Sequence, residues 1–183
     1  RSTLFPYTTL FRSLAGIDEA IRNLICVGGR VDRIALLDNF CWAKCTDPAV
    51  MGTLVRAAQA CYDGALAFQA PFISGKDSLN NEFVCEDGTV IRIPPTLLIS
   101  AMSLVDDIDT CVTMDLKSAG NLLFIVGRTN NELGGSHYYR LHGVLGAQVP
   151  KLDLELAPRI ARQLADAIAE GLVASCHDCS EGG

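Results

Sequence analysis

The sequence lacks any apolar run long enough to cross a lipid bilayer. Its longest candidate, residues 96–105, has ten residues, whereas a membrane-spanning helix needs roughly 20. The sequence also lacks an excess of positive charge, because 15 Lys and Arg residues face 21 Asp and Glu residues and leave a net charge of -6. Nucleic acids and anionic membranes attract clustered Lys and Arg. We therefore expect a soluble protein that has neither as its main partner.

The eight cysteines show no pattern typical of a zinc site. The two close pairs, CWAKC at 41–45 and CHDC at 176–179, are much farther apart than the usual spacing of zinc ligands. The other four stand singly in apolar surroundings, where a reduced cysteine behaves as a small hydrophobe. These are Cys26, Cys61, Cys85 and Cys111. This usage favours a reducing compartment, and we expect a cytoplasmic protein.

Residues 1–13, RSTLFPYTTLFRS, lack the continuous period of a helix or a strand. They also lack the basic start, long apolar core and cleavage site of a signal peptide. They resemble translated sequencing-adapter sequence, so we treat them as a non-native leader. An ordinary extended segment is the alternative.

From Leu14 onward, apolar residues recur at spacings of three and four, which predicts a helix that Gly28 ends. Glu19 and Asn23 lie four residues apart and share one face of this helix. They form either a solvated polar stripe or a pair of oxygen ligands for Mg²⁺. Residues 33–37 are then predicted to form a buried strand. Asp38 and Asn39 would follow at its C-terminal end, a usual place for ligand groups in α/β proteins.

Residues 71–82, PFISGKDSLNNE, combine a short apolar run with a polar segment. We predict that a strand breaks at Gly75 and that Lys76, Asp77 and Ser78 lie in the turn that follows. A glycine lets backbone N–H groups approach an anion, a lysine adds charge, and a serine hydroxyl binds phosphate or a metal. Ordinary turn chemistry is the alternative.

The remaining elements alternate between helices and strands, which predicts an α/β (α+β) fold. Asp106 and Asp107 end one strand and either bind a metal or cap the strand end. The glycines before Ser136 either cradle an anion or turn the chain. The predicted elements are a helix capped by Thr46 or Asp47, a hairpin over 83–93, strands at 96–105, 121–126 and 172–175, and a helix over 153–170.

Six motifs occur in one order along the chain. They are IALLDNFCW (34–42), PFISGKDSLNNE (71–82), IPPTLLISAMSLVDD (93–107), NELGGSHYY (131–139), PKLDLEL (150–156) and CHDCSEGG (176–183). This ordered set resembles the second half of phosphoribosylformylglycinamidine synthases. The resemblance covers residues 14–183 and a minor part of the full synthetase.

The resemblance implies a fragment of the duplicated fold shared with aminoimidazole ribonucleotide synthetase. Residues 14–107 would be the second copy of a smaller sheet domain, and residues 108–183 would begin a larger α/β domain that is truncated. The implied activity is the ATP- and Mg²⁺-dependent amidation of formylglycinamide ribonucleotide, in purine biosynthesis, with ammonia released from glutamine. The implied partners are the first half of the same synthetase, a glutaminase domain or subunit, and the nucleotide substrate.

The resemblance also implies site residues. Asp38 and Gly75 match ATP contacts of the smaller synthetases, and Ser78 matches a substrate contact. Lys76 stands where those proteins have an asparagine ligand for Mg²⁺. Because a protonated lysine offers no lone pair, Lys76 either contacts the nucleotide phosphates or the ion is held elsewhere.

The large, fused synthetases share the GKDS sequence. Their Mg²⁺ ligands match Glu19, Asn23 and Asp178, and a nucleotide contact matches Ser180. The catalytic histidine of the family belongs to the first half, so no catalytic residue is assigned here.

Two functional interpretations stay open. The chain contributes either to a catalytic ATP site or to a non-catalytic half that holds a structural ADP. A third possibility is another member of the superfamily, such as aminoimidazole ribonucleotide synthetase or a thiamine phosphate kinase. The motifs PFISGKDSLNNE and NELGGSHYY argue against the third.

Overall fold

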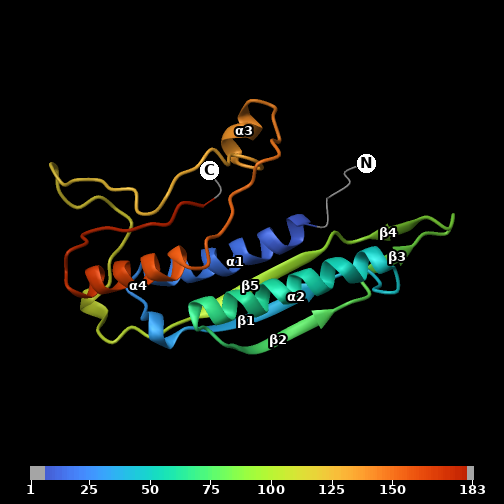
Figure 1. Ribbon diagram of the computed structural model, residues 1–183, viewed down its shortest axis with the longest axis horizontal. Coiled ribbons are helices and arrows are strands. Elements are labelled where there is room, and N and C mark those ends of the chain that lie inside the picture. Colours follow the sequence, from blue (N-terminus) through green and yellow to red (C-terminus); the bar gives the residue numbers. More distant parts are fainter. Residues whose placement is uncertain (1–6, 181–183) are drawn as a thin grey trace.

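The computed structural model describes residues 7–180 of the chain, with side chains from Thr9 onward. The long helices and the small sheet run along the length of the molecule, and extended segments connect the shorter elements (Figure 1). This mixture confirms the α/β (α+β) class. The elements are α1 (Tyr7–Ile25), β1 (Ala35–Cys41), α2 (Pro48–Phe68), β2 (Phe72–Ser78), β3 (Glu82–Val84), β4 (Val90–Arg92), β5 (Thr96–Met102), α3 (His137–Leu141) and α4 (Leu156–Ala169), with short 3-10 turns at Val31–Arg33 and Ile108–Thr110.

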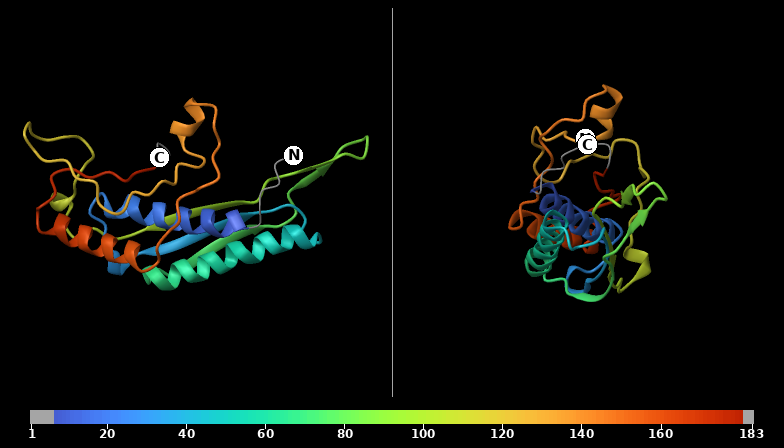
Figure 2. Two further views of the ribbon diagram at one scale, coloured as in Figure 1. Left: turned by 45° about the horizontal axis from the view of Figure 1, so that its top comes forward. Right: turned by 90° about the vertical axis from the view of Figure 1, so that its right-hand side faces the viewer.

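The main sheet has three strands in the order β2-β1-β5. The central strand β1 pairs in parallel with β2 and antiparallel with β5. Leu36 and Phe40 of β1 are buried in one hydrophobic core with residues of α1 and α2, so both helices cover the same face of the sheet. α4 lies beside α1 in both orientations of the ribbon (Figures 1 and 2).

Helix α1 begins earlier than the sequence predicts. Its buried stripe of Ile17, Ile21 and Ile25 is the predicted one, and the helix ends before Gly28, which adopts φ 99°. However, the helix continues back to Tyr7, and Ser13 is buried with its hydroxyl donating to the Thr9 carbonyl at 2.8 Å. The prediction that residues 1–13 have no helical structure is therefore wrong for 7–13. Residues 1–6 lie outside the described part of the chain.

Helix α2 starts where its cap predicts. The Asp47 carboxylate accepts a hydrogen bond from the Ala49 N–H at 2.9 Å, with Pro48 in the first turn. Val55 and Tyr62 of this helix are exposed. Apart from Phe68, the residues that the helix buries are small, because α1 lies close to this face. A Cβ at Gly64, for example, would lie 2.9 Å from the Ile17 side chain.

The predicted hairpin is confirmed by the antiparallel pairing of β3 with β4, with Gly88 at φ 81° in the turn. The strand predicted over 96–105 is also present, as β5. Beyond it, the Asp107 side chain accepts a hydrogen bond from the Asp109 N–H, and Asp106 forms an ion pair with Arg30 at 2.7 Å. Asp107 therefore caps the 3-10 turn that follows β5, and Asp106 is paired with Arg30 instead of capping the strand.

Two strands predicted in the second half are wrong. Residues 121–126 form an extended segment whose apolar side chains are exposed, and 172–175 contribute a single bridge between Thr113 and Ser175. A strand needs a neighbour to hydrogen-bond, and between residues 7 and 180 no strand pairs with 121–126.

The helix predicted over 153–170 is confirmed as α4. Its buried Ala161 belongs to the same core cluster as Ile17 of α1. The domain boundary expected near residue 107 stays a prediction. None of the helices in the described part of the chain is both long enough and apolar enough to span a membrane.

Candidate functional site

The segment expected to form a turn at Gly75 is instead the strand β2. Gly75, Lys76, Asp77 and Ser78 all lie within it, because the segment pairs with β1 along its length. Asp38 likewise lies in the middle of β1 and not at its end. The register places Asp38 opposite Gly75, Asn39 opposite Lys76, and Cys41 opposite Ser78.

The strand alternation divides the predicted nucleotide contacts between two faces. Leu36 and Phe40 are buried against the helices, and side chains along a strand alternate between faces. Asp38, which lies between them, therefore faces the helices. Gly75 and Asp77 oppose Asp38 and Phe40 and share that face. Lys76 and Ser78 point to the other side of the sheet, so the structure brings Asp38 together with Gly75 but not with Lys76 or Ser78.

Asp38 is a half-buried carboxylate in an environment that disfavours its charge. Burial, and then the nearby charge of Asp77, raise the pKa of Asp38, while a hydrogen bond from the Lys76 backbone N–H opposes the rise. Burial and the charge of Asp38 together raise the pKa of Cys61 on α2 to about 12. Asp38 thus lies close enough to Cys61 of α2 for its charge to act on that thiol.

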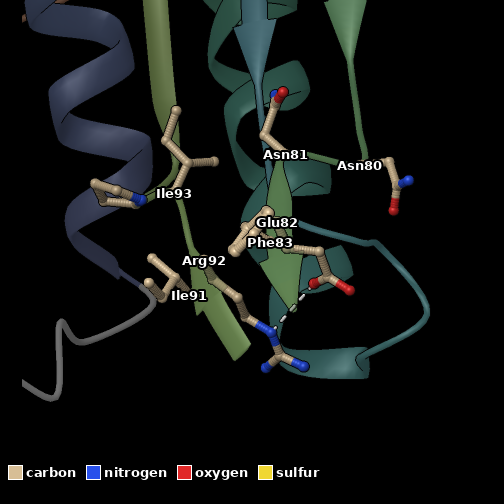
Figure 3. Close-up of a pocket in the computed structure, with 8 residues that line it drawn as sticks. Asn80, Asn81, Glu82, Phe83, Ile91, Arg92 and Ile93 are labelled. Carbon is tan, nitrogen blue, oxygen red and sulfur yellow. Dashed lines mark hydrogen bonds and ion pairs between the residues drawn. The ribbon is translucent and has the colours of Figure 1, made fainter. Parts of the chain in front are cut away.

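A shallow hollow lies against the β3–β4 hairpin (Figure 3). Glu82 and Arg92 form an ion pair across it at 3.3 Å, and Phe83 and Ile91 lie beside them. None of the site residues predicted from the sequence lines this hollow. The hollow therefore does not coincide with the predicted site.

A second group of predicted residues gathers where the C-terminal loop, residues 176–180, contacts α1. Arg22 of α1 donates from Nη1 to the Cys179 carbonyl at 2.6 Å and to Asp178 Oδ2 at 3.3 Å. Its Nε donates to Asp18 at 2.8 Å. The Asp178 side chain is only 2% exposed, and the Ser180 hydroxyl donates to the same Oδ2 at 2.8 Å. Arg22 thus connects the loop to the helix.

Two carboxylates, Asp18 and Asp178, lie near each other where the 176–180 loop contacts α1. Burial is the main cause of the raised pKa of Asp18, the charge of Asp178 raises it further, and Arg22 opposes the rise. Arg22 therefore serves as the shared counter-ion of two carboxylates.

Glu19 and Asn23 flank Arg22 on α1. Glu19 is half-buried and Asn23 is exposed, and both lie within one helical turn of Arg22. The structure thus brings Asp178 and Ser180 onto the helix that carries Glu19 and Asn23. Within residues 7–180, no hydrogen bond joins Asp178 directly to Glu19 or Asn23.

The donor set fits a hard cation in its chemistry. Glu19, Asn23 and Asp178 all offer oxygen atoms, which Mg²⁺ prefers, whereas soft metals prefer sulfur. Asp178 already shares one oxygen between Arg22 and Ser180. A cation at this carboxylate would therefore bind next to Arg22 or replace it.

Sequence reasoning missed three features of these clusters. Asp77 lies on the same face as Asp38, which only the strand register reveals. Arg22 holds the C-terminal loop, and its four-residue spacing from Asp18 was the local sign of an ion pair. The sulfur atoms of Cys26 and Cys176 lie 3.4 Å apart, and no sequence pattern indicated that contact.

Comparison with known proteins supports the resemblance drawn from the motifs. The chain is 35% identical over 183 residues to the phosphoribosylformylglycinamidine synthase subunit PurL of Methanocaldococcus jannaschii. The match covers 98% of this chain and 24% of the archaeal protein, so the chain spans about a quarter of that relative's length. No protein-family profile matches the chain. The similarity to a synthase of this kind is thereby confirmed.

Proposed function

We propose that the chain is part of a phosphoribosylformylglycinamidine synthase, an ATP- and Mg²⁺-dependent ligase that amidates formylglycinamide ribonucleotide with ammonia from glutamine. The identity of 35% to the archaeal subunit, over 98% of this chain, supports the proposal. The structural observation that carries it is the contact between the 176–180 loop and α1. This contact joins the two segments that hold the proposed metal ligands.

At this contact, Glu19, Asn23 and Asp178 would hold Mg²⁺. The ion would neutralise charge on the nucleotide phosphates. Arg22 positions the loop through the Cys179 carbonyl. The Ser180 hydroxyl, which donates to Asp178, would donate to a phosphate oxygen of the bound nucleotide instead.

On the sheet, Asp38 and Gly75 are the proposed ATP contacts that share a face. Lys76 would offer its ammonium group to phosphate, and Ser78 would contact the substrate, both from the opposite face. A nucleotide that contacts Asp38 would have to pass around the edge strand β2 to reach the Lys76 side chain. We therefore place the Lys76 contact with a ligand on the outer side of the sheet.

We further propose the fold organisation that the family resemblance implies. Residues 14–107 would be a smaller domain of the aminoimidazole ribonucleotide synthetase type, and 108–183 would begin the larger one. Packing of α4 against α1 would join the two. The first half of the synthetase and a glutaminase would complete the enzyme, so we expect no turnover by the 183-residue chain alone.

A second candidate is a non-catalytic half that holds a structural ADP. The Asp178 side chain favours it, because a carboxylate that is 2% exposed and already paired suits a permanently held ligand better than one exchanged at each turnover.

One double variant separates the two candidates. In the full-length protein, Glu19→Gln with Asn23→Ala removes two proposed metal ligands. Gln59→Ala with Asp63→Asn removes a hydrogen-bonded pair of the same spacing on α2 and serves as the control. Ammonia-dependent turnover, melting temperature and bound nucleotide are measured for both.

If the site is catalytic, the Glu19/Asn23 variant loses kcat and keeps its melting temperature. If it holds a structural nucleotide, that variant releases the nucleotide and melts earlier. A Glu19/Asn23 variant that behaves like the control in all three measurements would contradict both candidates.

A further inference from the structure

Cys26 and Cys176 place two thiols in contact although 150 positions separate them in the sequence. Cys26 directly follows the last residue of α1. Cys176 begins the loop that carries Asp178 and Ser180. Their sulfur atoms lie 3.4 Å apart, and all eight cysteines are free.

We propose that Cys26 and Cys176 form a reversible disulfide when the protein meets a low-molecular-weight disulfide of the glutathione type. The bond would fix the 176–180 loop to the end of α1.

The geometry needs little rearrangement. A disulfide holds its sulfur atoms about 2.05 Å apart, so the two thiols must approach by about 1.4 Å. Both sides of the loop are already held in place. The Cys176 N–H donates to the Thr113 carbonyl at 3.3 Å, and Arg22 holds the Cys179 carbonyl at 2.6 Å. We expect rotation of the two side chains to close the remaining gap between the sulfur atoms.

The two cysteines differ in access, which sets the order of the steps. Cys176 is half-exposed, whereas Cys26 is only 7% exposed. Cys176 therefore meets the oxidant first, and Cys26 reacts within the protein.

The disulfide would form in two successive thiol–disulfide exchange reactions. The Cys176 sulfur attacks one sulfur of the small disulfide, which breaks that bond, releases one small thiol and leaves a mixed disulfide on Cys176. The Cys26 sulfur then attacks Cys176 and releases the second small thiol. The two protein thiols are oxidised, the small disulfide is reduced, and the two small thiols carry away the two protons.

Cys179 is the competitor for Cys176. It is exposed and lies three residues farther along the same loop. However, Cys26 is the residue whose sulfur already contacts Cys176. A bond between Cys176 and Cys179 would leave the loop free of α1, so it is an outcome that contradicts the proposal.

The effect of the bond on ligands rests on the proposed function. A loop fixed to α1 keeps Asp178 and Ser180 beside Glu19 and Asn23, so oxidation would slow the release of bound Mg²⁺ and ADP. Formation of the bond itself does not depend on that function.

The test uses the full-length protein, treated with oxidised glutathione, alkylated, and digested without reductant. Mass spectrometry should find one peptide pair linked through Cys26 and Cys176, lighter by two hydrogens than the separate peptides. The link should be absent from both Cys26→Ser and Cys176→Ser. It should persist in the control Cys61→Ser, which removes another buried cysteine. If Cys26→Ser does not fold, Cys176→Ser decides the question, since its site is half-exposed.

Alkylation of both Cys26 and Cys176 after oxidation would overturn the proposal, and so would a bond between Cys176 and Cys179. Calorimetry with Mg²⁺ and ADP on the same samples is a separate readout. If the link forms but no nucleotide binds in either redox state, the disulfide is supported and the proposed function is contradicted.

Discussion

The Asp38 carboxylate fills the space that a side chain at position 75 would occupy. The two residues face each other across β1 and β2, and a Cβ at Gly75 would lie 2.8 Å from Asp38 Cγ. Gly75 is therefore needed for its lack of a side chain and not for a turn conformation. The half-buried Asp38 carboxylate therefore occupies its position only because residue 75 is a glycine.

Gly75→Ala should destabilise the protein, because the new methyl group overlaps the Asp38 side chain. Overpacking of this kind costs about 1–3 kcal/mol, measured as the free energy of unfolding in urea. Gly52→Ala is the matched control. It lies in α2 with no atom within 4 Å of a new Cβ, so helix propensity should stabilise that variant by up to about 1 kcal/mol. Equal stability of Gly75→Ala and the wild type would show that the sheet does not have this close contact.

Asp38→Asn should stabilise the protein at neutral pH. The pKa of Asp38 is raised by burial and by Asp77, so its ionised form opposes folding. That cost is fully present above the raised pKa, falls as the pH passes down through it, and disappears below 3.8, the ordinary value. The advantage of the variant in urea denaturation should therefore shrink on acidification.

Asp87→Asn provides a control of opposite sign. The Thr89 backbone N–H lowers the pKa of Asp87, so its stabilising effect is present above 3.8 and is lost as the pH falls through the lowered pKa. If Asp38→Asn and Asp87→Asn shift stability in the same direction at neutral pH, the buried environment assigned to Asp38 is wrong.

Arg22→Ala should loosen the C-terminal loop. It removes the guanidinium from the buried carboxylate of Asp178, which keeps its hydrogen bond from Ser180, and it removes the donor to the Cys179 carbonyl, at a cost of about 1–3 kcal/mol. Hydrogen exchange should rise across residues 176–180. Arg30→Ala is the control, because its partners Asp32 and Asp106 are 55% and 70% exposed, and exposed ion pairs contribute little. Unchanged exchange in the loop of Arg22→Ala would mean that Arg22 does not hold it.

Ile168→Ala should test whether α4 is packed on the first half of the chain. Ile168 is 2% exposed, and its side chain would lie 3.8 Å from a Cβ at Gly28, just beyond α1. Truncation of a buried isoleucine costs about 2–5 kcal/mol, which a thermal or urea melt would detect. Leu141→Ala, at a side chain that is 85% exposed, should have no effect. Similar melts for the two variants would place α4 outside the core.

Local chemistry made much of the first half predictable. Asp47 followed by Pro48 marked the start of α2, and Asp87 with Gly88 marked the hairpin turn, because capping and turn residues act on their immediate neighbours. The buried stripe of α1 was predictable because its apolar residues recur at helical spacings of three and four. Gly75 was interpreted incorrectly as a strand breaker, since the reason for a glycine there is a side chain 37 positions earlier in the sequence.

Contacts between distant segments could not be predicted from local patterns. The apolar run at 121–126 has the composition of a strand, but pairing depends on a neighbour that its own residues do not specify. Asp178 approaches α1 through Arg22, 156 positions away. Only the family resemblance predicted that Asp178 and Glu19 contribute to one metal site. It did not predict that Arg22 would contact Asp178.

The most direct measurement of the central claim is calorimetric titration of the full-length protein with ADP and ATP, with and without Mg²⁺. The wild type is compared with Glu19→Gln/Asn23→Ala and with the control Gln59→Ala/Asp63→Asn. We predict that the wild type and the control bind nucleotide more tightly with Mg²⁺, and that the Glu19/Asn23 variant loses at least about tenfold in that affinity, or 1.4 kcal/mol. Equal Mg²⁺-dependent affinities in all three proteins would contradict the assignment of this site.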